Sequence, residues 1–114
     1  MNILTEPKFK GDSISLGMTS SIAITGFEIR AEFFDGSSNS IKLATSNVTG
    51  GSDDQIEITS STEFTIKVAP DLTTNFKNDS SLEIELKNAS GTYQETKRFD
   101  FKFQSQKITW TNVT

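Results

Sequence analysis

The chain has 114 residues, of which 33% are hydrophobic and 23% charged, and its formal net charge is −4. It contains no histidine and no cysteine, which excludes Ser-His-Asp and Cys-His catalysis, zinc sites with His or Cys ligands, and disulfides. The acidic balance argues against a nucleic-acid partner, and no apolar run approaches the roughly 18–20 residues of a membrane span. We therefore expect one domain, residues 1–114, with no cofactor.

Short runs in which apolar and polar residues alternate follow one another along the chain, and this is the pattern of half-buried strands. Loops rich in Gly, Ser, Asn and Asp at residues 35–39, 50–54 and 88–91 predict hairpins. The spacing of Leu72 and Phe76 behind Pro70 predicts one short helical turn near 70–76. The pattern favours an all-β, antiparallel sandwich of seven or eight short strands. The alternating runs cover residues 14–18, 27–33, 41–43, 56–58, 64–68, 82–86 and 99–103, and a last one holds Ile108 and Trp110.

The apolar positions of the strongest runs predict the core. Extending the parity of Phe99 backward would point Glu95 and Lys97 inward, so we expect a bulge or a break between Tyr93 and Arg98. The residues expected to be buried are Ile29, Phe33, Phe64, Ile66, Ile84, Phe99 and Phe101.

Carboxylate pairs are the remaining option for catalysis. Glu83 and Glu85 share the outer face of a strand, and Asp53 and Asp54 lie in a Gly-rich loop. Solvated carboxylates lack the raised pKa that a glycosidase acid needs, so we expect no enzymatic activity. We predict instead that Glu83 and Glu85 pair with Lys or Arg on neighbouring strands.

Calcium is the metal that oxygen-rich loops of this kind could hold. Residues 35–39 lack the alternating acidic ligands and the closing Glu of an EF-hand loop. Asp53, Asp54 and Asp79 could converge only if the fold happened to bring them together. Turn chemistry accounts for these residues, and we expect no metal site.

Phe34 interrupts the polar set formed by Glu28, Arg30 and Glu32, so it should point away from the core that receives Phe33. Two interpretations remain: a strand end at which both faces are covered, or an apolar contact with another subunit. Trp110 is the other aromatic candidate, either covering the edge of the core or serving as a platform for a sugar. The candidate assembly contacts are Phe34, Trp110 and the loop from Asp35 to Asn39.

Two segments combine turn and strand signals in a recognisable order: residues 11–16 (GDSISL) and residues 24–32 (ITGFEIRAE). With the later strand and turn signals, they resemble small domains of tailed-phage tail and baseplate proteins over about residues 9–103. The N-terminal domain of upper baseplate proteins in phages of Gram-positive hosts is similar in outline. Phe34 and residues 104–114 depart from that pattern, which leaves the mode of assembly open.

The resemblance implies an immunoglobulin-like sandwich and a non-enzymatic structural role in a virion assembled in the host cytoplasm. The implied partners are other tail or baseplate proteins, or copies of the chain itself. The alternative is a secreted or surface-displayed immunoglobulin-like module for binding or adhesion, with carbohydrate among its ligands.

Overall fold

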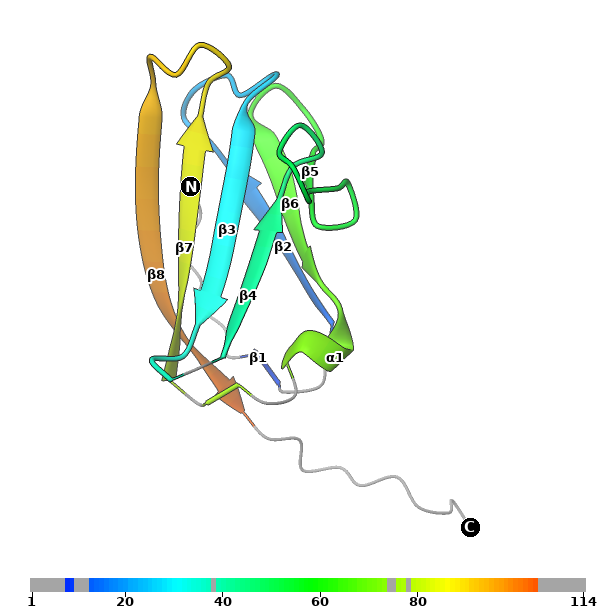
Figure 1. Ribbon diagram of the computed structural model, residues 1–114, viewed down its shortest axis with the longest axis vertical. Helices are drawn as coiled ribbons and strands as arrows, with labels where there is room; N and C mark the ends of the chain where they lie inside the picture. The colour runs from blue at the N-terminus through cyan, green and yellow to red at the C-terminus, as the bar shows by residue number, and fades with distance from the viewer. Residues whose placement is uncertain (1–7, 10–12, 38, 74–75, 78, 105–114) are drawn as a thin grey trace.

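The computed structural model of the chain describes the backbone of residues 8–9, 13–37, 39–73, 76–77 and 79–104. These residues form short strands and one short helix, α1 (Pro70–Thr73) (Figure 1). The strands are β1 (Lys8–Phe9), β2 (Ile14–Thr19), β3 (Glu28–Phe34), β4 (Ser40–Ala44), β5 (Ile56–Ile58), β6 (Glu63–Val68), β7 (Asp79–Lys87) and β8 (Gln94–Gln104).

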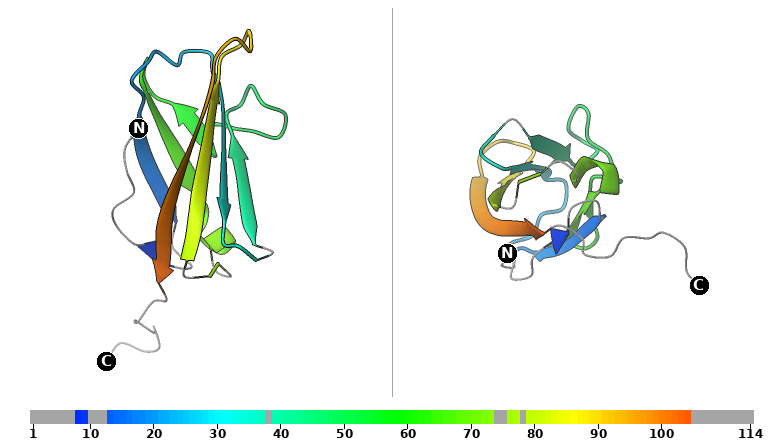
Figure 2. Two further views of the ribbon diagram at one scale, coloured as in Figure 1. Left: turned by 90° about the vertical axis from the view of Figure 1, so that its left-hand side faces the viewer. Right: turned by 90° about the horizontal axis from the view of Figure 1, so that it is seen from below.

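The strands form two sheets that pack face to face (Figure 2). The larger sheet has five strands in the order β1-β8-β7-β3-β4, and the smaller has three in the order β2-β6-β5. Neighbouring strands run antiparallel except β1 and β8, which are parallel, with Lys8 opposite Phe103. The predicted β-sandwich with one short helical turn is confirmed.

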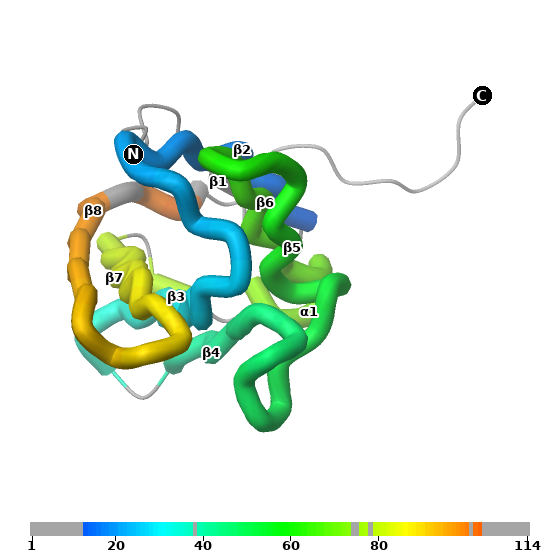
Figure 3. Tube along the Cα trace, turned by 90° about the horizontal axis from the view of Figure 1, so that it is seen from above, coloured from blue at the N-terminus to red at the C-terminus, as the bar shows by residue number. Residues whose placement is uncertain are grey.

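Two of the three predicted hairpins are present, and one is not. Residues 35–39 join the paired strands β3 and β4, and residues 88–91 join β7 and β8. Residues 50–54, in contrast, connect β4 of the five-stranded sheet to β5 of the three-stranded sheet. This connection projects away from the sandwich when it is seen from above (Figure 3). Turn residues show where the chain reverses, but the sheet that the next strand joins depends on distant partners.

The core lies between the two sheets and contains most of the predicted residues. Ile29, Phe33, Phe64, Ile66 and Ile84 are all buried. Phe99, which we expected to be buried, packs against the core but is only partly buried. The reason is that β8 lies near the margin of its sheet. The side chain of Phe101 lies outside the described residues. Phe76, which lies between α1 and β7, meets Phe103 of β8 edge-on, with ring centres 5.2 Å apart.

Strand β8 stays paired with β7, without interruption, through the segment where we expected a bulge. Its pairing with β7 continues without a shift from Lys87 opposite Gln94 to Asp79 opposite Lys102, so the predicted break between Tyr93 and Arg98 is wrong. Glu95 and Lys97 do share the inward parity, but they stay partly exposed and form an ion pair at 3.7 Å. Charges that point inward near a sheet margin are tolerated where the second sheet does not cover them, and they discourage edge-to-edge pairing.

Candidate interaction surface on the five-stranded sheet

The outward face of the five-stranded sheet carries ion pairs between residues that lie directly opposite each other. Oε2 of Glu83 accepts hydrogen bonds from Nε of Arg98 at 3.1 Å and from its Nη2 at 2.7 Å. Glu85 lies opposite Arg30, whose Nη1 is 3.2 Å from Glu85 Oε1. Both glutamates therefore pair with a cation on a neighbouring strand, as predicted. All four side chains are partly exposed, so each pair stabilises the fold by only about 0.2–1 kcal/mol.

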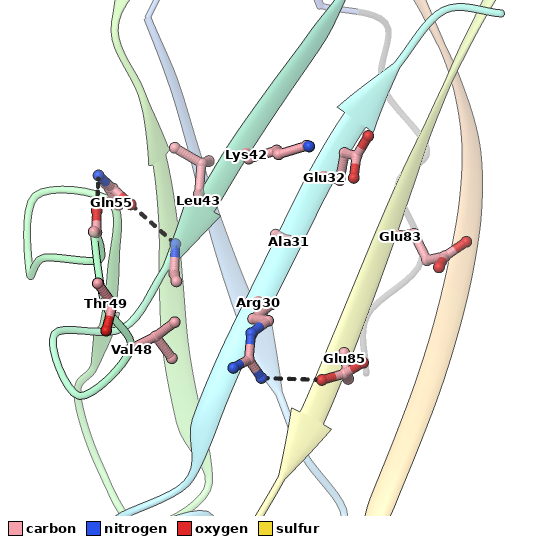
Figure 4. Close-up of a pocket in the computed structure, with 12 residues that line it drawn as sticks. Arg30, Ala31, Glu32, Lys42, Leu43, Val48, Thr49, Gln55, Glu83 and Glu85 are labelled. Carbon is pink, nitrogen blue, oxygen red and sulfur yellow. Dashed lines mark hydrogen bonds and ion pairs between the residues drawn. The ribbon is translucent and has the colours of Figure 1, made fainter.

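A groove of about 470 Å³ lies on this face beside the connection between β4 and β5 (Figure 4). Its side chains come from β3, β4, β7 and the connection itself. Glu32 is opposite Glu83 on one side and Lys42 on the other, and among the described residues Glu32 takes part in no ion pair. The groove mixes both signs of charge. The charged residues that line it are Arg30, Glu32, Lys42, Glu83 and Glu85.

The wall of this groove is held in place by hydrogen bonds that the loop makes with the sheet. The Gln55 side chain accepts from the Ala44 backbone N at 3.0 Å and donates to the Gly50 carbonyl at 3.1 Å. The Asn47 amide donates to the Phe27 carbonyl at 3.0 Å. At Gly51 a Cβ would lie 2.0 Å from the Thr45 carbonyl oxygen, so only glycine fits there. The connection between β4 and β5 is therefore held in a defined conformation against the sheet.

Phe34 ends β3 on the outward face, as the alternation predicts. Its neighbour Phe33 is 1% exposed in the core, whereas Phe34 is half-buried. The guanidinium carbon of Arg98 lies 5.3 Å from the centre of the Phe34 ring, within the range of a cation–π contact. Among the outward-pointing residues of β3, β4 and β7 and of residues 94–102 of β8, Phe34 is the only large apolar one.

A second concavity, of about 450 Å³, opens beside Phe34, and we call it the Phe34 cleft. The Lys102 ammonium is 3.3 Å from Asp79 Oδ1, and the Ser81 hydroxyl donates to Asp100 Oδ1 at 2.9 Å. These four residues sit on β7 and β8, next to the end of β3. The cleft is lined by Phe34, Asp35, Gly36, Asp79, Ser80, Ser81, Asp100 and Lys102.

Asp35 organises the loop between β3 and β4. Its Oδ1 accepts from the backbone N and the hydroxyl of Ser37, at 3.0 and 2.8 Å. Its Oδ2 accepts from Asn39 Nδ2 and from the Lys77 backbone N, both at 2.9 Å. Desolvation opposes ionisation, but the four donors outweigh it and hold the pKa of the Asp35 carboxyl well below its ordinary value of 3.8. Asp35 therefore forms part of the rim of the cleft, and Asn39 helps to hold its carboxylate in place.

The structure thus brings together three of the four predicted contact residues, and Trp110 lies outside the described residues. Arg98, Asp79, Asp100 and Lys102 were missed as neighbours of Phe34. They become neighbours only through the register of β7 with β8 and with β3. Aligning the alternating runs on either side of residues 88–91 would have suggested the β7–β8 part of this register.

Glu83 and Glu85 both line the groove described above, but the three aspartates considered for calcium do not converge. Asp53 and Asp54 are exposed in the connection between β4 and β5, whereas Asp79 lies in β7. Within the described ranges, no three acidic side chains come close enough together to hold a metal ion. Both oxygens of Asp35 are occupied by donors of the chain itself.

The fold and this surface define an all-β sandwich domain with two concavities on the outer face of its larger sheet. Comparisons with models of known protein families and with curated protein sequences found no match for this chain. In the part of the chain that the structure describes, no helix has the length and apolar character needed to cross a bilayer.

Proposed function

We propose that the chain is a non-enzymatic structural component of a phage or prophage-derived tail or baseplate. It acts through protein–protein contacts made by the outward face of the five-stranded sheet around Phe34. The observation that carries the contact is the half-buried Phe34, which lines a cleft among polar outward-pointing residues of β7 and β8. Clusters of this kind, an aromatic surrounded by polar groups, are typical of interaction surfaces.

The assignment to a tail rests on the resemblance carried by residues 11–16 and 24–32, and on the sandwich fold that the resemblance implies. The immunoglobulin-like character of the sandwich belongs to the same proposal. A virion location and partners among the neighbouring tail proteins follow from it. Assembly through a modest surface is effective in a tail because many copies and partners bind at once.

The test is incorporation into tail particles in the host that carries the surrounding genes. Tagged wild-type chain and the variants Phe34→Ser and Lys67→Ser are expressed, tails are isolated on a density gradient, and the chain is detected with an antibody to the tag. Lys67 lies on the other sheet, so Lys67→Ser is the matched control. We expect wild type and Lys67→Ser in the tail fraction, and at least about tenfold less Phe34→Ser, as for loss of a central aromatic contact.

Two results would overturn the proposal. One is wild-type chain that is absent from tail particles, and its recovery from the medium or the cell surface would then support a secreted or displayed binding module. The other is Phe34→Ser incorporated as well as wild type, which would remove Phe34 from the contact.

A further inference from the structure

The Phe34 cleft is preformed, because its parts are tied together from separate segments of the chain. Asp35 links the loop after β3 to the backbone of Lys77, which precedes β7. The Ser80 hydroxyl donates to the Lys77 carbonyl at 3.1 Å, so the start of β7 is tied to the same point. A partner that enters this cleft does not have to order it first, which lowers the entropic cost of binding.

The Phe34 ring takes part both in a contact with Arg98 and in the lining of the cleft. Arg98 lies over the Phe34 ring, and Glu83 holds its guanidinium there through Nε and Nη2. The ring still contributes to the lining of the cleft. A large apolar side chain of a partner can therefore contact Phe34 without displacing Arg98, and such contacts supply most of the energy at protein–protein interfaces.

The charges that line the cleft are predominantly negative. Asp35, Asp79 and Asp100 contribute three carboxylates, against the one ammonium of Lys102. The positive charge of Arg98, above the cleft, is matched by Glu83. Exposed charges around an apolar anchor select partners of the opposite sign and accelerate their association.

We infer that the Phe34 cleft receives a large apolar side chain flanked by lysine or arginine, presented by a partner protein. This inference rests on the proposed function, because it names the chemistry of the contact that the proposed assembly uses. A partner whose apolar anchor is flanked by acidic residues is rejected by the carboxylates. Binding carries little entropic cost for ordering the cleft, and the charges at its rim determine which apolar side chains are accepted.

The test uses the full chain labelled with ¹⁵N and three synthetic pentapeptides. The first has a central Trp with two lysines on each side, the second has glutamates in place of the lysines, and the third has Ser in place of the Trp. Each is titrated while amide chemical shifts are followed by NMR. We expect the lysine–Trp peptide to shift amides around Phe34, Ser81 and Lys102 and to bind at least about tenfold more tightly than either other peptide.

Variants then separate the two components of recognition. Phe34→Ser should weaken the lysine–Trp peptide at least about fivefold, and so should Asp79→Asn combined with Asp100→Asn. Lys67→Ser on the opposite sheet should bind like wild type. Raising the salt from about 0.05 to 0.5 M should weaken binding to wild type and have less effect on the double Asn variant.

Each contrary result overturns the inference. If the Ser peptide binds as tightly as the lysine–Trp peptide, no apolar anchor is needed. If the glutamate peptide binds as tightly or more tightly, the cleft has no preference for basic flanks. Amide shifts confined to another face would show that the peptide does not bind in the cleft. Failure of this inference can be distinguished from failure of the proposed tail function. Binding of the lysine–Trp peptide by a chain absent from tail particles overturns the assignment alone, and incorporation into tails without the peptide preference overturns the cleft inference alone.

Discussion

Arg98 of β8 and Phe34 of β3 meet across the intervening strand β7, with the guanidinium carbon 5.3 Å from the ring centre. Ser81 is the β7 residue directly opposite Phe34, and its short side chain leaves room for Arg98 to reach over. Glu83, two positions further along β7, lies opposite Arg98 and fixes the guanidinium. The contact therefore depends on three strands in one register.

Replacement of Phe34 should cost little stability compared with replacement of its neighbour. Phe34→Ser should lower the free energy of unfolding by about 1 kcal/mol, because it removes a cation–π contact and the partial burial of one ring. Phe33→Ala should cost about 3–5 kcal/mol, because Phe33 is fully buried between the sheets. Urea denaturation measures both. A Phe34→Ser variant that does not fold would place Phe34 in the core and exclude it as a contact residue.

The interaction between Arg98 and Phe34 should appear as a coupling in a double-mutant cycle. Phe34→Leu and Arg98→Met, alone and together, should give a coupling free energy of about 0.5–1 kcal/mol, since the cation and the ring are partly exposed. The same cycle with Arg30→Met is the control, because Arg30 lies four residues before Phe34 on the same face of β3. Its coupling should lie within about 0.3–0.5 kcal/mol of zero. Equal couplings in the two cycles would argue against a specific contact.

Asp35 should make stability depend on pH in the acid range. Its pKa in the folded chain lies below the ordinary value of 3.8, so the folded state favours the carboxylate. The stabilisation is complete above that value and is lost as the pH falls further below it toward the folded pKa. The difference in Tm between wild type and Asp35→Asn should therefore be largest near neutral pH and shrink on acidification. The exposed Asp71 supplies the control Asp71→Asn. A Tm difference between wild type and Asp35→Asn that stays constant down to pH 2 would contradict a lowered pKa of Asp35.

Gly51 should tolerate no side chain, whereas Gly17 should. A Cβ at Gly51 would lie 2.0 Å from the carbonyl oxygen of Thr45, so Gly51→Ala must displace the backbone of the connection between β4 and β5 and should cost about 1–3 kcal/mol. A Cβ at Gly17 meets nothing within 4 Å, and Gly17→Ala should be neutral or stabilise by up to about 1 kcal/mol. Thermal unfolding of both variants tests the pair, and equal losses would mean that the close approach at Gly51 is absent.

Alternation in the sequence by itself determined the fold class and the face of the sheet on which the residues of β3, β6 and β7 lie. It placed Ile29, Phe33 and Ile66 in the core and Phe34 on the outward face, and it located the loops at residues 35–39 and 88–91. This works because side chains alternate across a strand, so the burial of one residue determines the parity of its neighbours within the same strand. The absence of His and Cys restricted the chemistry in the same direct way.

The tertiary structure decided which strands lie side by side, and therefore the composition of the candidate site. It led residues 50–54 from one sheet to the other, kept β8 paired with β7 through Glu95 and Lys97, and placed Arg98, Asp79 and Asp100 around Phe34. Register and sheet order depend on which distant apolar faces are buried together, and a period of two residues carries no information about that choice. Phe34 was visible in the sequence as an exception, but its neighbours exist only where β3, β7 and β8 align.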